Sequence, residues 1–180
     1  VMGDGHGTVA QFGATDDVDL IMATFSKAFA SLGGVVAGDK EVISYIKHNA
    51  RALIFSASIP PANAAATLEA LRILRDEEPD RPARVLAIAE HMRNELRGMG
   101  FNLGNSVTPV VPIIIGENEK TFMFWKGLME IGVFVNPVVS PAVPVGRALL
   151  RTSYMATHTD EQIEFVLNAY KKVGKSLGVI

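Results

Sequence analysis

Short apolar runs that alternate with helical patterns constrain the fold of this chain more than any other feature. The runs are rich in aliphatic residues and have the continuous apolar character of strands buried on both faces. They cover residues 18–25, 34–38, 53–56, 110–115, 133–136 and 149–153. Between them, apolar residues recur at helical spacing in segments 39–49, 60–75, 82–97, 119–131 and 159–177. The alternation predicts an α/β fold with a parallel or mixed sheet.

A polar segment with two prolines, residues 76–82, interrupts this alternation. Proline and charged residues between two periodic segments are typical of a loop at a domain boundary. We therefore predict two domains: an α/β part over residues 1–78 and an α+β part over residues 79–180.

Composition excludes several classes of function. The 180 residues are 48% hydrophobic, which is enough to bury a core. Seventeen Lys and Arg against nineteen Asp and Glu leave a net charge of −2 and no basic stripe, so nucleic acid is not an expected partner. The chain has no cysteine, and its histidines lack the spacing of metal ligands, so neither a disulfide nor a metal site is expected. No apolar run approaches the ~20 residues of a membrane span, and a cytoplasmic location is expected.

A lysine follows directly on the first predicted strand. Thr24, Phe25, Ser26 and Lys27 come where that strand ends, and Gly33 and Gly34 allow a tight turn soon after. Ligands of α/β folds gather at the carboxyl ends of strands, and a lysine amine there can form a Schiff base with a carbonyl cofactor. By spacing alone, an exposed lysine beside ordinary turn residues is the commoner explanation.

Two further stretches carry candidate binding residues. Ser56 and Ala57 precede a helix that starts at proline, where hydroxyls and free N–H groups form either an anion site or a plain helix cap. Arg151 lies inside an apolar strand, where it either holds a substrate carboxylate through its planar fork or forms an internal salt bridge. His158, just before the last helix, is interpreted as structural.

Together these stretches resemble the α-oxoamine synthases, a family of pyridoxal-phosphate enzymes in the fold-type I aminotransferase superfamily. The resemblance rests on residues 19–28, 33–34, 55–61, 150–153 and 156–159, in that order. Residues 133–144 are most similar to the bacterial serine palmitoyltransferase branch. The resemblance implies the C-terminal part of a large cofactor-binding domain followed by a small α+β domain.

The resemblance also implies roles for individual residues. Lys27 would bind pyridoxal 5′-phosphate covalently and later move the substrate's α-proton. Thr24 and Ser26 match positions that contact the cofactor near its O3′ and phosphate. Ser56 and Ala57 match a segment that reaches the phosphate bound by the partner subunit, which implies a homodimer with shared sites.

The implied reaction condenses an amino acid with an acyl-CoA thioester, usually with loss of CO2. Arg151 matches the arginine that holds the amino-acid carboxylate. Serine is the favoured substrate, as in sphingolipid biosynthesis; glycine with acetyl-CoA and alanine with a pimeloyl thioester remain alternatives, as does a non-catalytic subunit, which the presence of Lys27 disfavours. The family's aspartate for the cofactor ring nitrogen precedes the segment that resembles residues 1–13, and neither Asp4 nor His6 matches it. We therefore expect a C-terminal fragment that is inactive alone.

Overall fold

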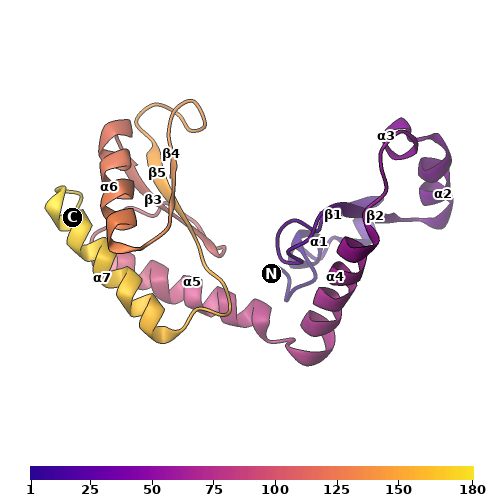
Figure 1. Ribbon diagram of the computed structural model, residues 1–180, viewed down its shortest axis with the longest axis horizontal. Coiled ribbons are helices and arrows are strands. Elements are labelled where there is room, and N and C mark those ends of the chain that lie inside the picture. Colours follow the sequence, from indigo (N-terminus) through magenta and orange to yellow (C-terminus); the bar gives the residue numbers. More distant parts are fainter. The chain divides into compact units, whose positions relative to one another are not determined.

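The computed structural model describes residues 1–180, which form two compact units, Val1–Pro82 and Ala83–Ile180 (Figure 1). The polar segment 76–82 lies at the end of the first unit. Each unit contains one sheet, and all strand pairs are antiparallel. The expectation of a parallel or mixed sheet is therefore wrong for the strands of this chain. Aliphatic composition reports how buried a strand is expected to be but not which way its neighbours run.

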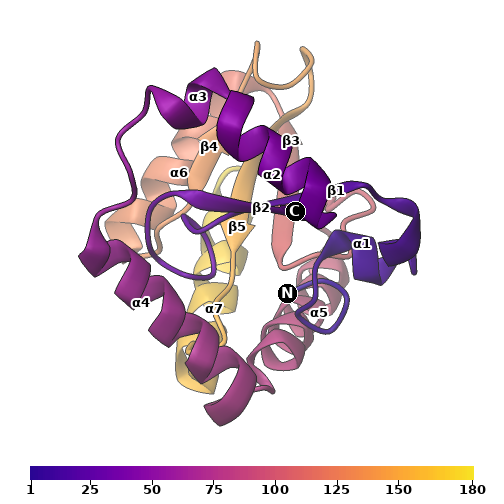
Figure 2. The same ribbon diagram turned by 90° about the vertical axis from the view of Figure 1, so that its right-hand side faces the viewer.

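The first unit contains two strands and several helices. Its elements are α1 (Thr8–Gln11), η1 (Thr15–Asp17), β1 (Leu20–Thr24), β2 (Gly34–Gly38), α2 (Lys40–Asn49), α3 (Arg51–Ile54), α4 (Pro61–Arg72) and the π-helical η2 (Ile73–Glu77). β1 and β2 form a hairpin in which Thr24 is opposite Gly34 and Leu20 is opposite Gly38. Helix α2 follows β2 and lies beside it (Figure 2).

Two sequence predictions fail in the first unit. β1 and β2 were expected to be buried on both faces, yet most of their side chains are exposed, Met22 by 69%. The strands pair only with each other, so each has few neighbours to cover it. Residues 53–56 were expected to form a strand, but Arg51–Ile54 is helix α3. Arg, Ala and Leu favour helices, and a short apolar run fits either structure.

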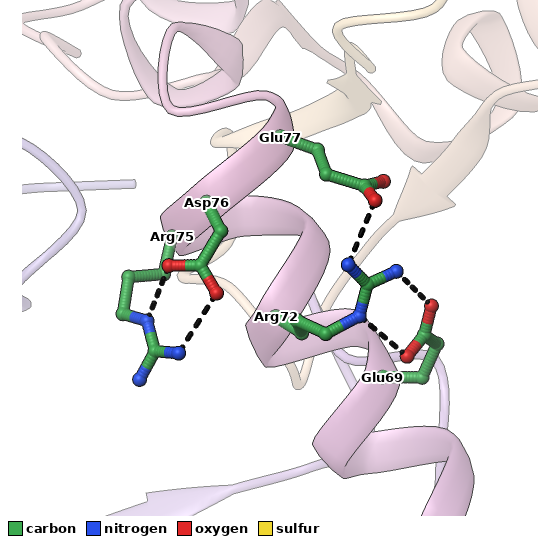
Figure 3. Close-up of polar contacts among 5 residues, drawn as sticks. All are labelled: Glu69, Arg72, Arg75, Asp76 and Glu77. Carbon is green, nitrogen blue, oxygen red and sulfur yellow. Dashed lines mark hydrogen bonds and ion pairs between the residues drawn. The ribbon is translucent and has the colours of Figure 1, made fainter.

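Helix α4 starts at Pro61, as predicted, and continues into the π-helical turn η2. The N–H of Glu78 donates to the carbonyl oxygen of Ile73 at 2.7 Å, which is the i→i+5 bond of a π-helix. Three ion pairs flank the change of helix type (Figure 3): Arg72–Glu69 at 2.6 Å, Arg72–Glu77 at 2.8 Å and Arg75–Asp76 at 2.6 Å. All these side chains are solvent-exposed, so the pairs contribute little to stability.

The second unit is an antiparallel sheet covered by helices. Its elements are α5 (Arg81–Gly98), β3 (Val110–Gly116), α6 (Asn118–Ile131), β4 (Asn136–Val138), β5 (Ala148–Ser153) and α7 (Asp160–Ser176), with strand order β3-β5-β4. The strand predicted over residues 133–136 is displaced. Val133 and Val135 are buried in the core, but ladder pairing begins only at Asn136.

The core of the second unit lies between one face of the sheet and the helices. In Figure 1, α6 and α7 both lie on the same side of the strands. The largest side chains with almost no exposure are Tyr170, Phe124, Met92, Leu96, Leu103, Ile113, Leu128 and Leu150. The rings of Phe101, Phe124 and Tyr170 contact one another at centroid distances of 6.0 to 6.2 Å.

Two tyrosines and a threonine bring polar groups into this core. Thr152 Oγ1 lies 2.8 Å from the carbonyl oxygen of Val111, to which it donates, and 3.0 Å from the hydroxyl of Tyr154. Burial raises the pKa of Tyr154 to about 12. Burial also raises the pKa of Tyr170 well above its usual value, and the Tyr170 hydroxyl has no protein hydrogen-bond partner.

The ends of two helices follow from local sequence. Thr159 and Gln162 form a reciprocal capping box at the start of α7. α6 ends at Gly132, whose φ of 97° lies in the left-handed region that glycine adopts without strain. No helix of the chain has both the length and the apolar character needed to cross a membrane.

Candidate functional site

Lys27 lies in the loop that joins β1 to β2, with its side chain exposed. Backbone bonds close this loop: the N–H of Phe25 donates to Gly33 at 2.9 Å, and that of Ser31 donates to Phe25 at 2.9 Å. The N–H of Ala30 donates to the carbonyl oxygen of Lys27 at 3.0 Å. The amine of Lys27 takes part in no ion pair or hydrogen bond. The backbone around Lys27 is therefore fixed, and its amine remains free to react.

The Lys27 loop is held against the start of α4. Ser31 Oγ donates to the carbonyl oxygen of Asn63 at 2.9 Å, and Asn63 Nδ2 donates back to Ser31 Oγ at 3.4 Å. Gly33, with φ of 95°, packs so closely on Ile59 that an added Cβ would lie 2.6 Å from Ile59 Cδ1. The sequence singled out both stretches separately. It gave no indication that they contact each other, because hydrogen bonds between side chains distant in sequence have no periodic pattern.

Several hydroxyl groups lie on these two stretches. Thr24 is the last residue of β1, Ser26 precedes Lys27, and Ser56 lies in the segment that leads to α4. None of the three hydroxyls forms a hydrogen bond within the chain. The backbone N–H of Ala57 also has no hydrogen-bond partner. Residues 24–34 and 55–63 contain no acidic side chain. A free amine with hydroxyl and N–H donors suits a ligand that carries a carbonyl and a phosphate.

Asp4 and His6 lie exposed in the loop that precedes α1. Asp4 has a positive φ of 53° within a series of turns. No group of three or more His, Asp or Glu side chains in the chain is arranged to hold a metal ion.

Arg151 lies on the central strand of the second unit's sheet. Its partners in register are Pro112 on β3 and Asn136 on β4. Side chains of β5 alternate, so that Leu150 and Thr152 face the core while Arg151 faces the opposite side and is exposed. Within the second unit, Arg151 forms no ion pair with a carboxylate.

The face of the sheet that carries Arg151 is otherwise uncharged. Its members on the three strands are Val110, Pro112, Ile114, Asn136, Val138, Leu149 and Ser153. No acidic residue occurs between Ile131 and Thr159. An unpaired guanidinium on such a surface is suited to bind a carboxylate through two parallel hydrogen bonds.

His158 has a structural role, as the sequence indicated. Its Nδ1 accepts a hydrogen bond from the N–H of Met155 at 3.2 Å, and its ring lies edge-on to Tyr154. Arg84 donates to its carbonyl oxygen at 3.4 Å. These contacts fix the turn between β5 and α7.

Comparison with known proteins gives a consistent set of relatives. Residues 1–169 match the family described as aminotransferase class I and II. The serine palmitoyltransferase of Sphingobacterium spiritivorum is 52% identical over 171 residues, which is 95% of this chain and 43% of that protein. A putative 8-amino-7-oxononanoate synthase 2 of Mycobacterium tuberculosis is 45% identical over 174 residues, which is 97% of this chain and 22% of that protein. The structure of the Sphingomonas wittichii serine palmitoyltransferase superposes with a TM-score of 0.94 at 31% identity, covering 99% of this chain and 46% of its own. The chain thus spans less than half the length of each of these three proteins.

Proposed function

This chain belongs to the aminotransferase class I and II family. From that membership we propose that it forms part of a pyridoxal-phosphate-dependent acyltransferase. The proposed reaction joins an amino acid to an acyl-CoA thioester, releases CoA and CO2, and yields a 2-amino ketone. The observation that carries the proposal is the free amine of Lys27 in a loop fixed against α4. Residues 1–78 would belong to the large cofactor domain and residues 79–180 to the small C-terminal domain.

Serine is the proposed amino acid. Support comes from the relative that is 52% identical, a serine palmitoyltransferase. Alanine is the second candidate, because relatives named 8-amino-7-oxononanoate synthase reach 45% identity. Both candidates carry an α-carboxylate, so the role proposed for Arg151 is the same for either.

Residues in and beside the Lys27 loop fit two parts of the proposed cofactor, the aldehyde with its neighbouring O3′ and the phosphate. Lys27 would hold the aldehyde carbon through its Nζ, and Thr24 and Ser26 would donate hydrogen bonds to the O3′ and phosphate oxygens. Residues 24–34 and 55–63 carry no acidic group that would repel the phosphate. When bound, the cofactor supplies an electron sink that allows the amino acid's α-carbon to attack the thioester.

Lys27 has a second proposed task. With the amino acid bound, the Lys27 amine would act as the base that takes the proton from the substrate's α-carbon. The loop geometry suits this task, because the backbone is held by three hydrogen bonds while the side chain has no partner to break from.

Arg151 would orient the substrate by its carboxylate. Its planar fork makes two parallel hydrogen bonds to the two carboxylate oxygens, and such bonds to charged groups are about twice as strong as neutral ones. The open sheet face offers no competing carboxylate.

Ser56 and Ala57 are proposed to serve a second copy of the chain. The Ser56 hydroxyl and the Ala57 N–H have no partner within the chain, so both can donate to a phosphate held by another subunit. The proposal therefore includes a homodimer, which light scattering of the purified protein would detect.

The test is reduction with borohydride, which fixes an imine-bound cofactor on its lysine. The complete gene product is loaded with pyridoxal phosphate, reduced, digested and mapped by mass spectrometry. We expect the label on Lys27, and we expect Lys27→Ala to abolish both the label and the release of CoA from serine and palmitoyl-CoA. Lys47→Ala, at an exposed lysine of α2, is the control and should leave both unchanged. A label on another lysine, or full turnover by Lys27→Ala, contradicts the proposal.

A further inference from the structure

Asn136 is the closest polar neighbour of Arg151 across the strands of the second unit. The two residues are directly opposite in the antiparallel pair β4–β5. Side chains of directly opposite residues project on the same side of a sheet, with Cβ atoms roughly 4.5–5.5 Å apart. Asn136 therefore lies beside the guanidinium on the open face. On the other neighbouring strand, β3, the residue paired with Arg151 is the apolar Pro112.

The carboxamide of Asn136 has no partner in the chain. Asn136 is exposed, and its side chain forms no hydrogen bond, although an Asn side chain offers two N–H donors and one acceptor. The residues before it alternate, with Val133 and Val135 buried, and this alternation turns Asn136 away from the core. Its orientation thus results from how the strand is buried.

The surroundings determine which kind of group this pair attracts. No acidic residue occurs between Ile131 and Thr159, and the face around the pair is built from aliphatic side chains and proline. A carboxylate that lies against Arg151 has four lone-pair sites, of which a bidentate guanidinium uses two. An amide N–H beside the guanidinium supplies a donor for one of the remaining sites.

We infer that Asn136 is a substrate-binding residue that donates a hydrogen bond to the α-carboxylate held by Arg151. This inference rests on the proposed function, in which an amino acid is the substrate. It makes the β4–β5 pair a two-residue carboxylate clamp, with the charge from one strand and the neutral donor from the other.

The experiment measures amino-acid binding to the cofactor-loaded complete gene product, from the change in visible absorbance on adding serine. Asn136→Ala should raise the dissociation constant for serine about 10- to 100-fold, the loss expected for a hydrogen bond to a charged group. The KM for the acyl-CoA should stay unchanged. Asn105→Ala, at an exposed turn residue of the same unit, is the matched control and should leave serine binding unaltered.

A second variant separates donation to the substrate from support of the arginine. Asn136→Asp keeps an acceptor oxygen that could orient the guanidinium, but it removes the donor and adds a charge that repels the carboxylate. The inference requires Asn136→Asp to bind serine more weakly than Asn136→Ala. Serine binding by Asn136→Asp at the wild-type level, or by Asn136→Ala within twofold of wild type, overturns it. If the wild-type protein instead fails to attach cofactor at Lys27, the proposed function itself fails, and the two results are distinguishable.

Discussion

Replacing Gly33 with alanine tests how the Lys27 loop is held. An alanine at this position meets two separate obstacles. Its φ of 95° lies outside the usual range of residues with a Cβ, which costs roughly 1–2 kcal/mol. Its Cβ would also lie 2.6 Å from Cδ1 and 2.8 Å from Cγ1 of Ile59, and such overpacking costs about 1–3 kcal/mol. We expect Gly33→Ala to lower the local free energy of opening by about 2–5 kcal/mol, the sum of these two ranges.

Hydrogen exchange read by mass spectrometry measures this opening in peptides that cover residues 25–34 and 56–63. Two variants separate the two costs. Gly13→Ala, with φ of 63° and no atom within 4 Å of an added Cβ, should show the backbone cost alone. Adding Ile59→Ala to Gly33→Ala removes both close atoms and should recover about 1–3 kcal/mol relative to the sum of the single variants. A coupling below about 0.5 kcal/mol would refute the packing argument.

Four further predictions concern the second unit. In the three that concern stability, unfolding of this unit in urea is followed by Trp125, the single tryptophan of the sequence, which packs against the core. Tyr170→Phe removes a buried hydroxyl that has no protein partner, so the free energy of unfolding should stay the same or rise by up to about 1 kcal/mol; a loss larger than that would show that the hydroxyl is bonded. Because the pKa of Tyr154 is raised to about 12, the unfolded state loses this proton first as pH rises above about 10; stability should then fall by about 2–3 kcal/mol, and Tyr154→Phe should flatten that decline. Thr159→Ala breaks the capping box of α7 and should cost about 1 kcal/mol, with an unchanged urea midpoint counting against the cap. Arg151→Lys keeps the charge but loses the planar fork, so serine binding by the holoenzyme should weaken by about tenfold or more; equal binding would exclude bidentate capture.

The helices show which structural features can be predicted from local sequence. The sequence predicts a helix that starts at a proline in residues 60–75, and α4 begins at Pro61. The cap of α7 also has a local signature, the Thr159 hydroxyl three residues before Gln162. Both depend on interactions within one turn, so the sequence contains all the information needed. The strand predicted over residues 53–56 failed because its apolar residues also suit a helix, and only contacts with the rest of the chain decide between the two.

The sheets show what the sequence does not determine. Aliphatic runs located β1 and β5 but indicated neither their antiparallel partners nor their register. Register matters for the candidate site, because it alone places Asn136 beside Arg151. This pairing could not be predicted, because alternating buried valines favour a strand over residues 133–136 whether or not those residues pair with another strand. In the structure, β4 begins only at Asn136.

The two faces of the second unit's sheet differ in how their polar groups are satisfied, and this difference argues for function. On the buried face, Thr152 is bonded to Val111 and lies within hydrogen-bonding distance of Tyr154. On the open face, Arg151 and Asn136 are directly opposite each other, and neither side chain forms a hydrogen bond or ion pair within the second unit. In the proposed function, the carboxylate of the amino acid would supply a hydrogen-bond partner for both side chains.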